Sequence, residues 1–227
     1  MNRYVVGAIH PWNRRIFDEH IATLPGEWTL IDGRRDLSLA RLSEINPKFV
    51  FFLHWSWKIP GQILDRFTCI NFHMTDLPYG RGGSPLQNLI LRGHTQTKLT
   101  AFKMTDGMDE GPIYTKEDLS LHGTAQEIYQ RASLLAAGMI RDFVDAPFEP
   151  TPQRGEVTVF TRRKPAESEI DEPPDAVALY DFIRMLDVEG YPRAFLRQGR
   201  FRYEFSKPSL AEGRFTARVE VVDEGSA

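Results

Sequence analysis

The chain has 227 residues, with 28 basic and 31 acidic side chains and a formal net charge of −3 at pH 7. No basic block dominates, which argues against a nucleic-acid-binding protein, and a single cysteine excludes an intrachain disulfide and a cysteine-based zinc site. No apolar run approaches the roughly 18 residues of a membrane span, and the first residues lack a signal-peptide pattern. We therefore expect a soluble, cytoplasmic protein without a membrane partner.

Strand and helix patterns alternate over the first third of the chain. Short β-branched and aromatic runs predict strands at residues 3–9, 27–32, 48–53 and 67–73. Apolar residues at helical spacing predict helices between them, at 13–24, 38–47 and 59–64. This alternation is typical of a parallel sheet with helices on both faces, and we expect an α/β, Rossmann-like fold.

The pattern then changes. A helix is expected at 84–93, with Ser84 as its N-cap, followed by two antiparallel strands at 98–105 and 112–121. A capping box of Thr124 and Glu127 opens a long helix at 125–145.

A domain boundary is predicted near residue 150, which divides the chain into domain 1–150 and a small α+β subdomain, 151–227. The subdomain is expected to contain strands at 156–162, 200–206 and 214–222 and a helix at 175–187.

The stretch "CINFHMTDLPYGRGGSPLQNLI" (69–90) contains the most informative polar residues. Residues i and i+2 of a strand point to the same side, so Asn71 and His73 project together from the end of the fourth strand. Open α/β sheets bind ligands at that edge. An isolated pair of this kind is more often a satisfied structural feature than a functional site.

Two neighbouring features favour a functional site. Glycines follow His73 in a turn that allows close backbone approach, and the loop "DGMDEGPI" (106–113) supplies Asp106, Asp109 and Glu110. An amide, an imidazole and a carboxylate are the groups required for acyl transfer to an amine.

Together the two stretches resemble the folate-dependent formyltransferases, mainly over residues 48–145. The resemblance implies 10-formyltetrahydrofolate as the formyl donor and neither a metal nor a nicotinamide. It assigns catalysis to Asn71, His73 and Asp109. The amide and the protonated imidazole would stabilise the oxyanion, and the carboxylate would hold the imidazole and help to remove the amine proton.

Within that family, "LYDFIRMLDVEGYPRAFL" (179–196) looks most like the sugar N-formyltransferases. This implies a nucleotide-linked deoxyaminosugar as acceptor, in cell-surface glycan biosynthesis. We expect no nucleic-acid partner, because the large C-terminal RNA-binding domain of the methionyl-tRNA enzyme is missing. We also expect a homodimer, because a lone hairpin is only marginally stable and two-fold dimers are common.

The resemblance also implies binding residues, although several of them could instead be structural. The donor side would be formed by Trp57, Lys58, Ile59 and Asp106. The acceptor side would be formed by Arg81, Gly82, Arg184, Tyr191 and Arg193.

Three alternatives remain open at this point. The acceptor could be another amine, such as glycinamide ribonucleotide or methionyl-tRNA. The protein could hydrolyse the formyl-folate, or it could bind folate or a nucleotide-sugar without turnover.

Overall fold

The structure is a computed structural model that describes residues 1–226. The chain forms two compact units. We call residues 1–82, 97–119 and 130–159 the sheet unit, and residues 83–96, 120–129 and 160–227 the hairpin unit. Both units draw on the middle of the chain. The functional division into 1–150 and 151–227 stays a prediction.

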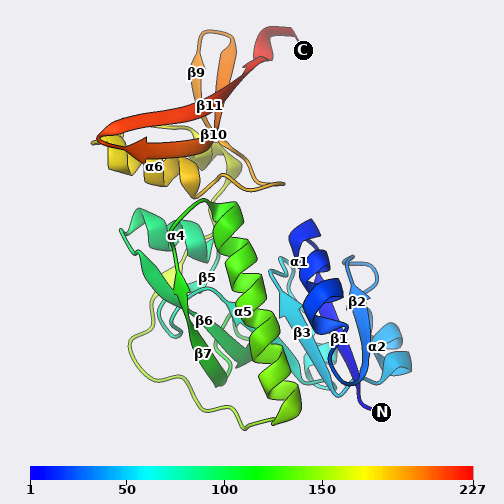
Figure 1. Ribbon diagram of the computed structural model, residues 1–227. Helices are drawn as coiled ribbons and strands as arrows, with labels where there is room; N and C mark the ends of the chain where they lie inside the picture. Colours follow the sequence, from blue (N-terminus) through cyan, green and yellow to red (C-terminus); the bar gives the residue numbers. More distant parts are fainter. Residues whose placement is uncertain (227) are drawn as a thin grey trace. The chain divides into compact units, whose positions relative to one another are not determined.

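The sheet unit is built on a six-stranded sheet of order β2-β1-β3-β4-β6-β7 (Figure 1). The pairs β1–β2, β1–β3 and β3–β4 are parallel, whereas β4 and β6 are antiparallel. The α/β prediction is therefore confirmed. The strands are β1 (Arg3–Ala8), β2 (Glu27–Ile31), β3 (Phe49–Leu53), β4 (Cys69–His73), β6 (Gln96–Lys103) and β7 (Ile113–Ser120).

The helices of the first half lie between these strands, as the sequence pattern predicts. They are α1 (Pro11–Ile16), α2 (Leu39–Ile45) and α3 (Gly61–Leu64). The predicted helix 13–24 differs, because α1 passes directly into a π-helical segment at Phe17–Ile21. Helix α5 (Ala125–Asp145) opens with the expected capping box, in which the Thr124 N–H donates to Glu127 Oε2 at 2.7 Å.

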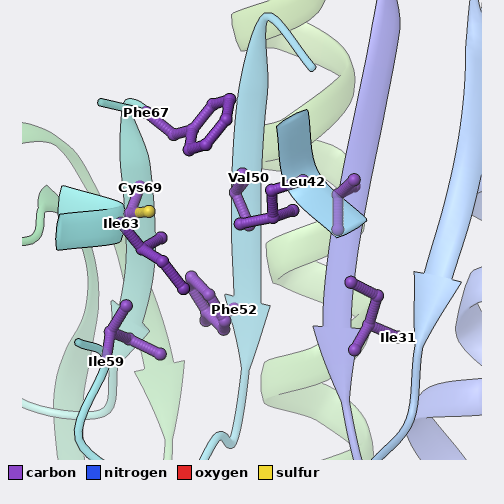
Figure 2. Close-up of a cluster of buried hydrophobic side chains, with 9 residues drawn as sticks. Ile31, Leu42, Val50, Phe52, Ile59, Ile63, Phe67 and Cys69 are labelled. Carbon is purple, nitrogen blue, oxygen red and sulfur yellow. The ribbon is translucent and has the colours of Figure 1, made fainter. Parts of the chain in front are cut away.

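Alternation along β3 divides the core between the two faces of the sheet. Phe49 and Phe51 face α5, where their rings lie 4.8 and 6.1 Å from the ring of Phe143. Val50 and Phe52 face the opposite way, into a cluster with side chains of α2, α3 and neighbouring strands (Figure 2). That cluster comprises Val5, Ile31, Leu42, Val50, Phe52, Ile59, Ile63, Phe67 and Cys69.

The hairpin unit contains an antiparallel sheet of order β11-β10-β9, with α6 packed against β10. The sequence predicted β10 and β11 but missed β9, which pairs with β10 from Phe201↔Gln198 to Phe205↔Ala194. Its elements are α4 (Pro85–Leu91), the 3-10 turn Pro165–Ser168, α6 (Ala176–Arg184), β9 (Ala194–Gln198), β10 (Phe201–Ala211), β11 (Arg214–Asp223) and the 3-10 turn Glu224–Ser226. A short pair, β5 (Arg81–Gly82) and β8 (Val159–Phe160), completes the structure.

Ser84 occupies the expected N-cap position of α4, but its side chain does not cap the helix. The residue has φ 49°, and its Oγ accepts the N–H of Arg163 at 3.0 Å instead. Within residues 1–226, the helices are all too short or too polar to cross a bilayer.

Candidate active site

Asn71 and His73 lie at the carboxyl end of β4. Cys69, on the same strand, belongs to the core cluster of Figure 2, and strand alternation places Asn71 and His73 on that same face. His73 is buried, and Asn71 is half-buried. The side-chain amide of Asn71 has no hydrogen bond to any residue within 1–226. It is therefore available to a ligand.

The two ring nitrogens of His73 have different environments. Nε2 lies 2.8 Å from the carbonyl oxygen of Gly80. Because a carbonyl only accepts, the neutral imidazole carries its proton on Nε2. The buried hydroxyl of Thr75 also donates to this carbonyl, at 3.4 Å. The Gly80 carbonyl therefore orients the ring, and Nδ1 is the nitrogen that faces Asp109.

Asp109 faces Nδ1 from the loop between β6 and β7. Its Oδ2 lies 3.7 Å from His73 Nδ1, which is longer than a hydrogen bond, and accepts the N–H of Gly82 at 2.9 Å. The resemblance implied that the carboxylate of Asp109 holds the imidazole of His73. In the structure, the backbone of the 78–82 turn holds the imidazole, and Asp109 places a negative charge beside it.

Arg81 stands next to this group on the same turn. Its Nε and Nη2 donate to Gln153 Oε1 at 3.1 and 2.8 Å, and its Nη1 lies 3.6 Å from Glu110. Gln153 and Thr75 were missed by the sequence reasoning. No pattern in the neighbouring sequence indicates either residue, because the groups that they bind come close to them only in the folded chain.

The loop 54–60 lies close to the loop that carries Asp109. A Cβ built on Gly61 would lie 3.2 Å from Asp106 Oδ1. Trp57 is half-buried, and its ring meets Trp55 edge to face at 5.1 Å. Ile59 is 1% exposed and packs in the core cluster, whereas Lys58 is exposed.

The backbone of residues 57–59 makes no hydrogen bond to the described part of the chain. These residues therefore offer an apolar wall with open backbone groups. This is the character expected of a pocket for a flat heterocycle.

His54 belongs to a buried polar network beneath this loop. Asn13 Nδ2 donates to Leu53 O at 3.1 Å and to His54 Nδ1 at 3.3 Å, and Ser133 Oγ donates to Asn13 Oδ1 at 2.6 Å. Burial, with a smaller contribution from His10, lowers the pKa of His54 to about 3. His54 is therefore neutral at physiological pH and takes part in this network.

The remaining predicted acceptor residues lie in the hairpin unit. Arg184 is buried, and its Nη1 donates to Leu121 O at 2.6 Å and Gly123 O at 2.8 Å. These contacts give Arg184 a structural role within its own unit. The ring of Tyr191 lies 6.1 Å from that of Tyr129.

Arg193 lines a cleft of about 440 Å³ in the hairpin unit. Lys207 and the carboxylates of Glu127, Asp187 and Glu189 share the cleft, so its lining carries both signs of charge. The roles of Arg184, Tyr191 and Arg193 in acceptor binding stay predictions. Within residues 1–226, no group of three or more His, Cys, Asp or Glu side chains is placed to hold a metal ion.

Two family models match the chain. Residues 34–140 match the model described as formyl transferase, and residues 165–222 match the model described as methionyl-tRNA formyltransferase, C-terminal domain. The first match contains the whole of the Asn71, His73 and Asp109 group.

Relatives agree with these models. The chain is 27% identical over 157 residues to methionyl-tRNA formyltransferase of Thermodesulfovibrio yellowstonii, covering 66% of this chain and 51% of that protein. It is 31% identical over 169 residues to the Methylobacterium nodulans enzyme, covering 69% of this chain and 54% of that protein. The chain thus spans about half the length of these curated relatives.

A solved structure resembles the chain over its full length. Methionyl-tRNA formyltransferase from Clostridium thermocellum is 44% identical, with a TM-score of 0.93, and the match covers 98% of this chain and 100% of that chain.

The chain is only distantly similar to the sugar N-formyltransferases, which the sequence favoured within the family. A sugar N-formyltransferase from Shewanella sp. is only 14% identical, with a TM-score of 0.68 and 96% of each chain covered, a likeness that shows the fold alone. The predictions of a nucleotide-linked aminosugar acceptor and of no nucleic-acid partner are contradicted by the relatives, which are methionyl-tRNA formyltransferases.

The physical reason for this error is that the motif around β4 serves the chemistry common to the family, whatever the acceptor. The acceptor depends on other parts of the chain, and residues 165–222 match a methionyl-tRNA formyltransferase domain despite their small size.

The site geometry, the match of residues 34–140 and the full-length likeness to the Clostridium thermocellum protein lead to one conclusion. The chain belongs to the formyl transferase family.

Proposed function

We propose that this protein transfers a formyl group from 10-formyltetrahydrofolate to the amino group of methionyl-tRNA. One arrangement supports this reaction. The side-chain amide of Asn71, which makes no hydrogen bond within residues 1–226, lies on the same strand face as His73. His73 Nδ1 faces the carboxylate of Asp109 at 3.7 Å. The acceptor is proposed from the relatives, which are methionyl-tRNA formyltransferases at up to 44% identity. Such an acceptor places the reaction in the cytoplasm.

Each residue of the site has a distinct role in the proposed reaction. As the amine nitrogen bonds to the formyl carbon, the formyl oxygen gains negative charge, and the Asn71 amide donates to it. His73, protonated at Nδ1, donates to the same oxygen. Asp109 stabilises the imidazolium and accepts the proton that the amine loses, directly or through water. The oxyanion then re-forms a carbonyl as the bond from carbon to the folate nitrogen breaks, and that nitrogen takes a proton from Asp109, directly or through water.

The residues that would hold the donor lie on the two loops beside this group. Trp57 supplies an aromatic wall, Ile59 closes the pocket from the core, and the open backbone groups of 57–59 can pair with the edge of a pterin ring. Asp106 lies at the junction of the two loops.

A direct assay tests the proposal. Purified protein is incubated with 10-formyltetrahydrofolate and methionyl-tRNA, and mass spectrometry measures the formyl gain on methionine after mild hydrolysis. We expect rapid formylation that the Asn71→Ala variant loses. Glycinamide ribonucleotide and a nucleotide-linked aminosugar serve as competing acceptors. Faster transfer to either, or release of formate without transfer, would overturn the proposed acceptor.

A further inference from the structure

Gln153 is in contact with the 78–82 turn and with the loop that carries Asp109. Its Oε1 accepts from Arg81 Nε and Nη2 at 3.1 and 2.8 Å. Its Nε2 donates to the carbonyl oxygens of Asp109 and Gly111, each at 2.8 Å. A guanidinium only donates and a carbonyl only accepts, so the amide can sit only one way round. All four hydrogen-bonding positions of the amide are filled.

One of these hydrogen bonds stabilises an unfavourable backbone conformation at Asp109. Asp109 is a non-glycine residue at φ 54°, a region that costs energy and persists only when its surroundings impose it. Gln153 holds the carbonyl of this same residue, while Gly82 N–H holds its carboxylate. The loop that carries Asp109 is thus tied to the 78–82 turn twice, once directly and once through Gln153 and Arg81.

We propose that Gln153 is a positioning residue that sets the distance between the Asp109 carboxylate and His73 Nδ1. It acts through its two donated hydrogen bonds, and the ion pair between Arg81 and Glu110 has only a supporting role. This inference rests on the proposed function, because it concerns the same reaction.

Two substitutions distinguish the role of the acceptor Oε1, which binds Arg81, from that of the donor Nε2, which binds the loop carbonyls. Gln153→Ala removes both ends, whereas Gln153→Glu keeps an acceptor for Arg81 but replaces the donor by an oxygen that faces two carbonyls. We expect both variants to lower kcat by roughly tenfold to a hundredfold, since misplacement of a reacting group by about 1 Å has this effect. In Gln153→Glu the KM of donor and acceptor should stay within about twofold, because Arg81 keeps its acceptor and Gln153 is not among the residues proposed to hold either substrate.

A double variant tests whether Gln153 works through Asp109. In an Asp109→Asn background, Gln153→Ala should lower kcat by less than about a further twofold, because the carboxylate that Gln153 positions is already absent. Gln198→Ala, at an exposed glutamine of β9, is the matched control and should leave kcat unchanged. Wild-type kcat in Gln153→Glu, or a full multiplicative loss in the double variant, would overturn the inference.

Hydrogen exchange keeps this test independent of the proposed acceptor. If the wild-type protein transfers formyl groups to none of the acceptors, the proposed function fails. The amides of residues 105–112 should nevertheless exchange faster in both Gln153 variants than in wild type and in Gln198→Ala. Unchanged exchange in these amides would show that Gln153 does not hold the loop.

Discussion

At the residue scale, the candidate site depends on which polar atoms already make hydrogen bonds within the protein. His73 uses Nε2 to donate to Gly80, and Asp109 uses Oδ2 to accept from Gly82, so both are oriented by backbone groups of one turn. Asn71 makes no such bond within residues 1–226. The site therefore combines two pre-oriented groups with one open donor, the arrangement that stabilises a charge developing on a bound substrate.

Substitution of each of these residues tests the assignment. We expect Asn71→Ala, His73→Asn and Asp109→Asn each to lower turnover on the order of a hundredfold or more, as loss of one oxyanion donor does. Asp118→Asn, at an exposed carboxylate of β7, is the control. Circular dichroism verifies the fold and a saturating-donor assay measures turnover. Near wild-type turnover in two of the three variants would refute the assignment.

At the element scale, the turn between β6 and β7 is built around a glycine that no other residue can replace. A Cβ on Gly111 would lie 1.6 Å from the carbonyl oxygen of Lys103. The turn is also closed by a bond from Lys103 N–H to Pro112 O at 2.9 Å. The geometry of this turn determines where Asp109 stands, two residues away.

Two glycine substitutions should therefore have opposite effects. Gly111→Ala should destabilise the protein by about 1–3 kcal/mol, because the backbone must move, and it should lower turnover by displacing Asp109. Gly138→Ala, inside α5 with no atom within 4 Å of its new Cβ, should stabilise by about 1 kcal/mol. Thermal unfolding measures both. Equal melting temperatures for the two variants would contradict this explanation.

The network of Asn13, His54 and Ser133 joins α1, the end of β3 and α5. Burial lowers the pKa of His54 from its usual 6.5 to about 3, so the unfolded chain binds a proton that the folded chain does not. The contribution of His54 to the free energy of unfolding is fully present above pH 6.5 and is lost as the pH falls from 6.5 toward 3.

We predict that His54→Asn flattens the decrease of melting temperature between pH 7 and pH 4. Asparagine tolerates the φ of 50° at this position and does not titrate there. His20→Asn, at an exposed histidine, is the matched control and should leave the decrease unchanged. An equally steep decrease in wild type and His54→Asn would show that another group governs acid unfolding.

At the scale of the whole molecule, the charge balance leaves few cations for a nucleic-acid partner. The chain carries 28 basic and 31 acidic side chains, and arginines of the hairpin unit are paired internally. Arg197 pairs with Glu169 and Glu224, and Arg200 with Asp223. Arg193 makes no ion pair within residues 1–226 and lines the cleft of the hairpin unit, so we test it as a candidate phosphate contact.

Binding of the proposed acceptor should therefore depend on salt and on Arg193. We expect the KM for methionyl-tRNA to rise with salt, and Arg193→Ala to raise it further while the slope of log KM against log salt falls by up to about one. Arg200→Ala, which removes a cation paired at 2.6 Å, should change neither. Identical behaviour of the two variants would exclude a specific phosphate contact at Arg193.

The sequence by itself determined most of the elements and pointed to the group of Asn71, His73 and Asp109. Hydrophobic period, capping residues and glycine positions act over a few neighbouring residues, which is why β1 to β4, α5 and the shared face of Asn71 and His73 could be predicted. The loop that carries Asp109 was also visible, because its glycines and carboxylates are adjacent in the chain.

Only the tertiary structure decided the contacts that hold these groups. Gly80 O reaches His73 across seven residues, and Gln153 reaches Asp109 across 44. The buried guanidinium of Arg184 donates to carbonyl oxygens more than 60 residues away in the sequence. Such contacts leave no local pattern, since a polar side chain can make its hydrogen bonds with any segment that folding brings to it.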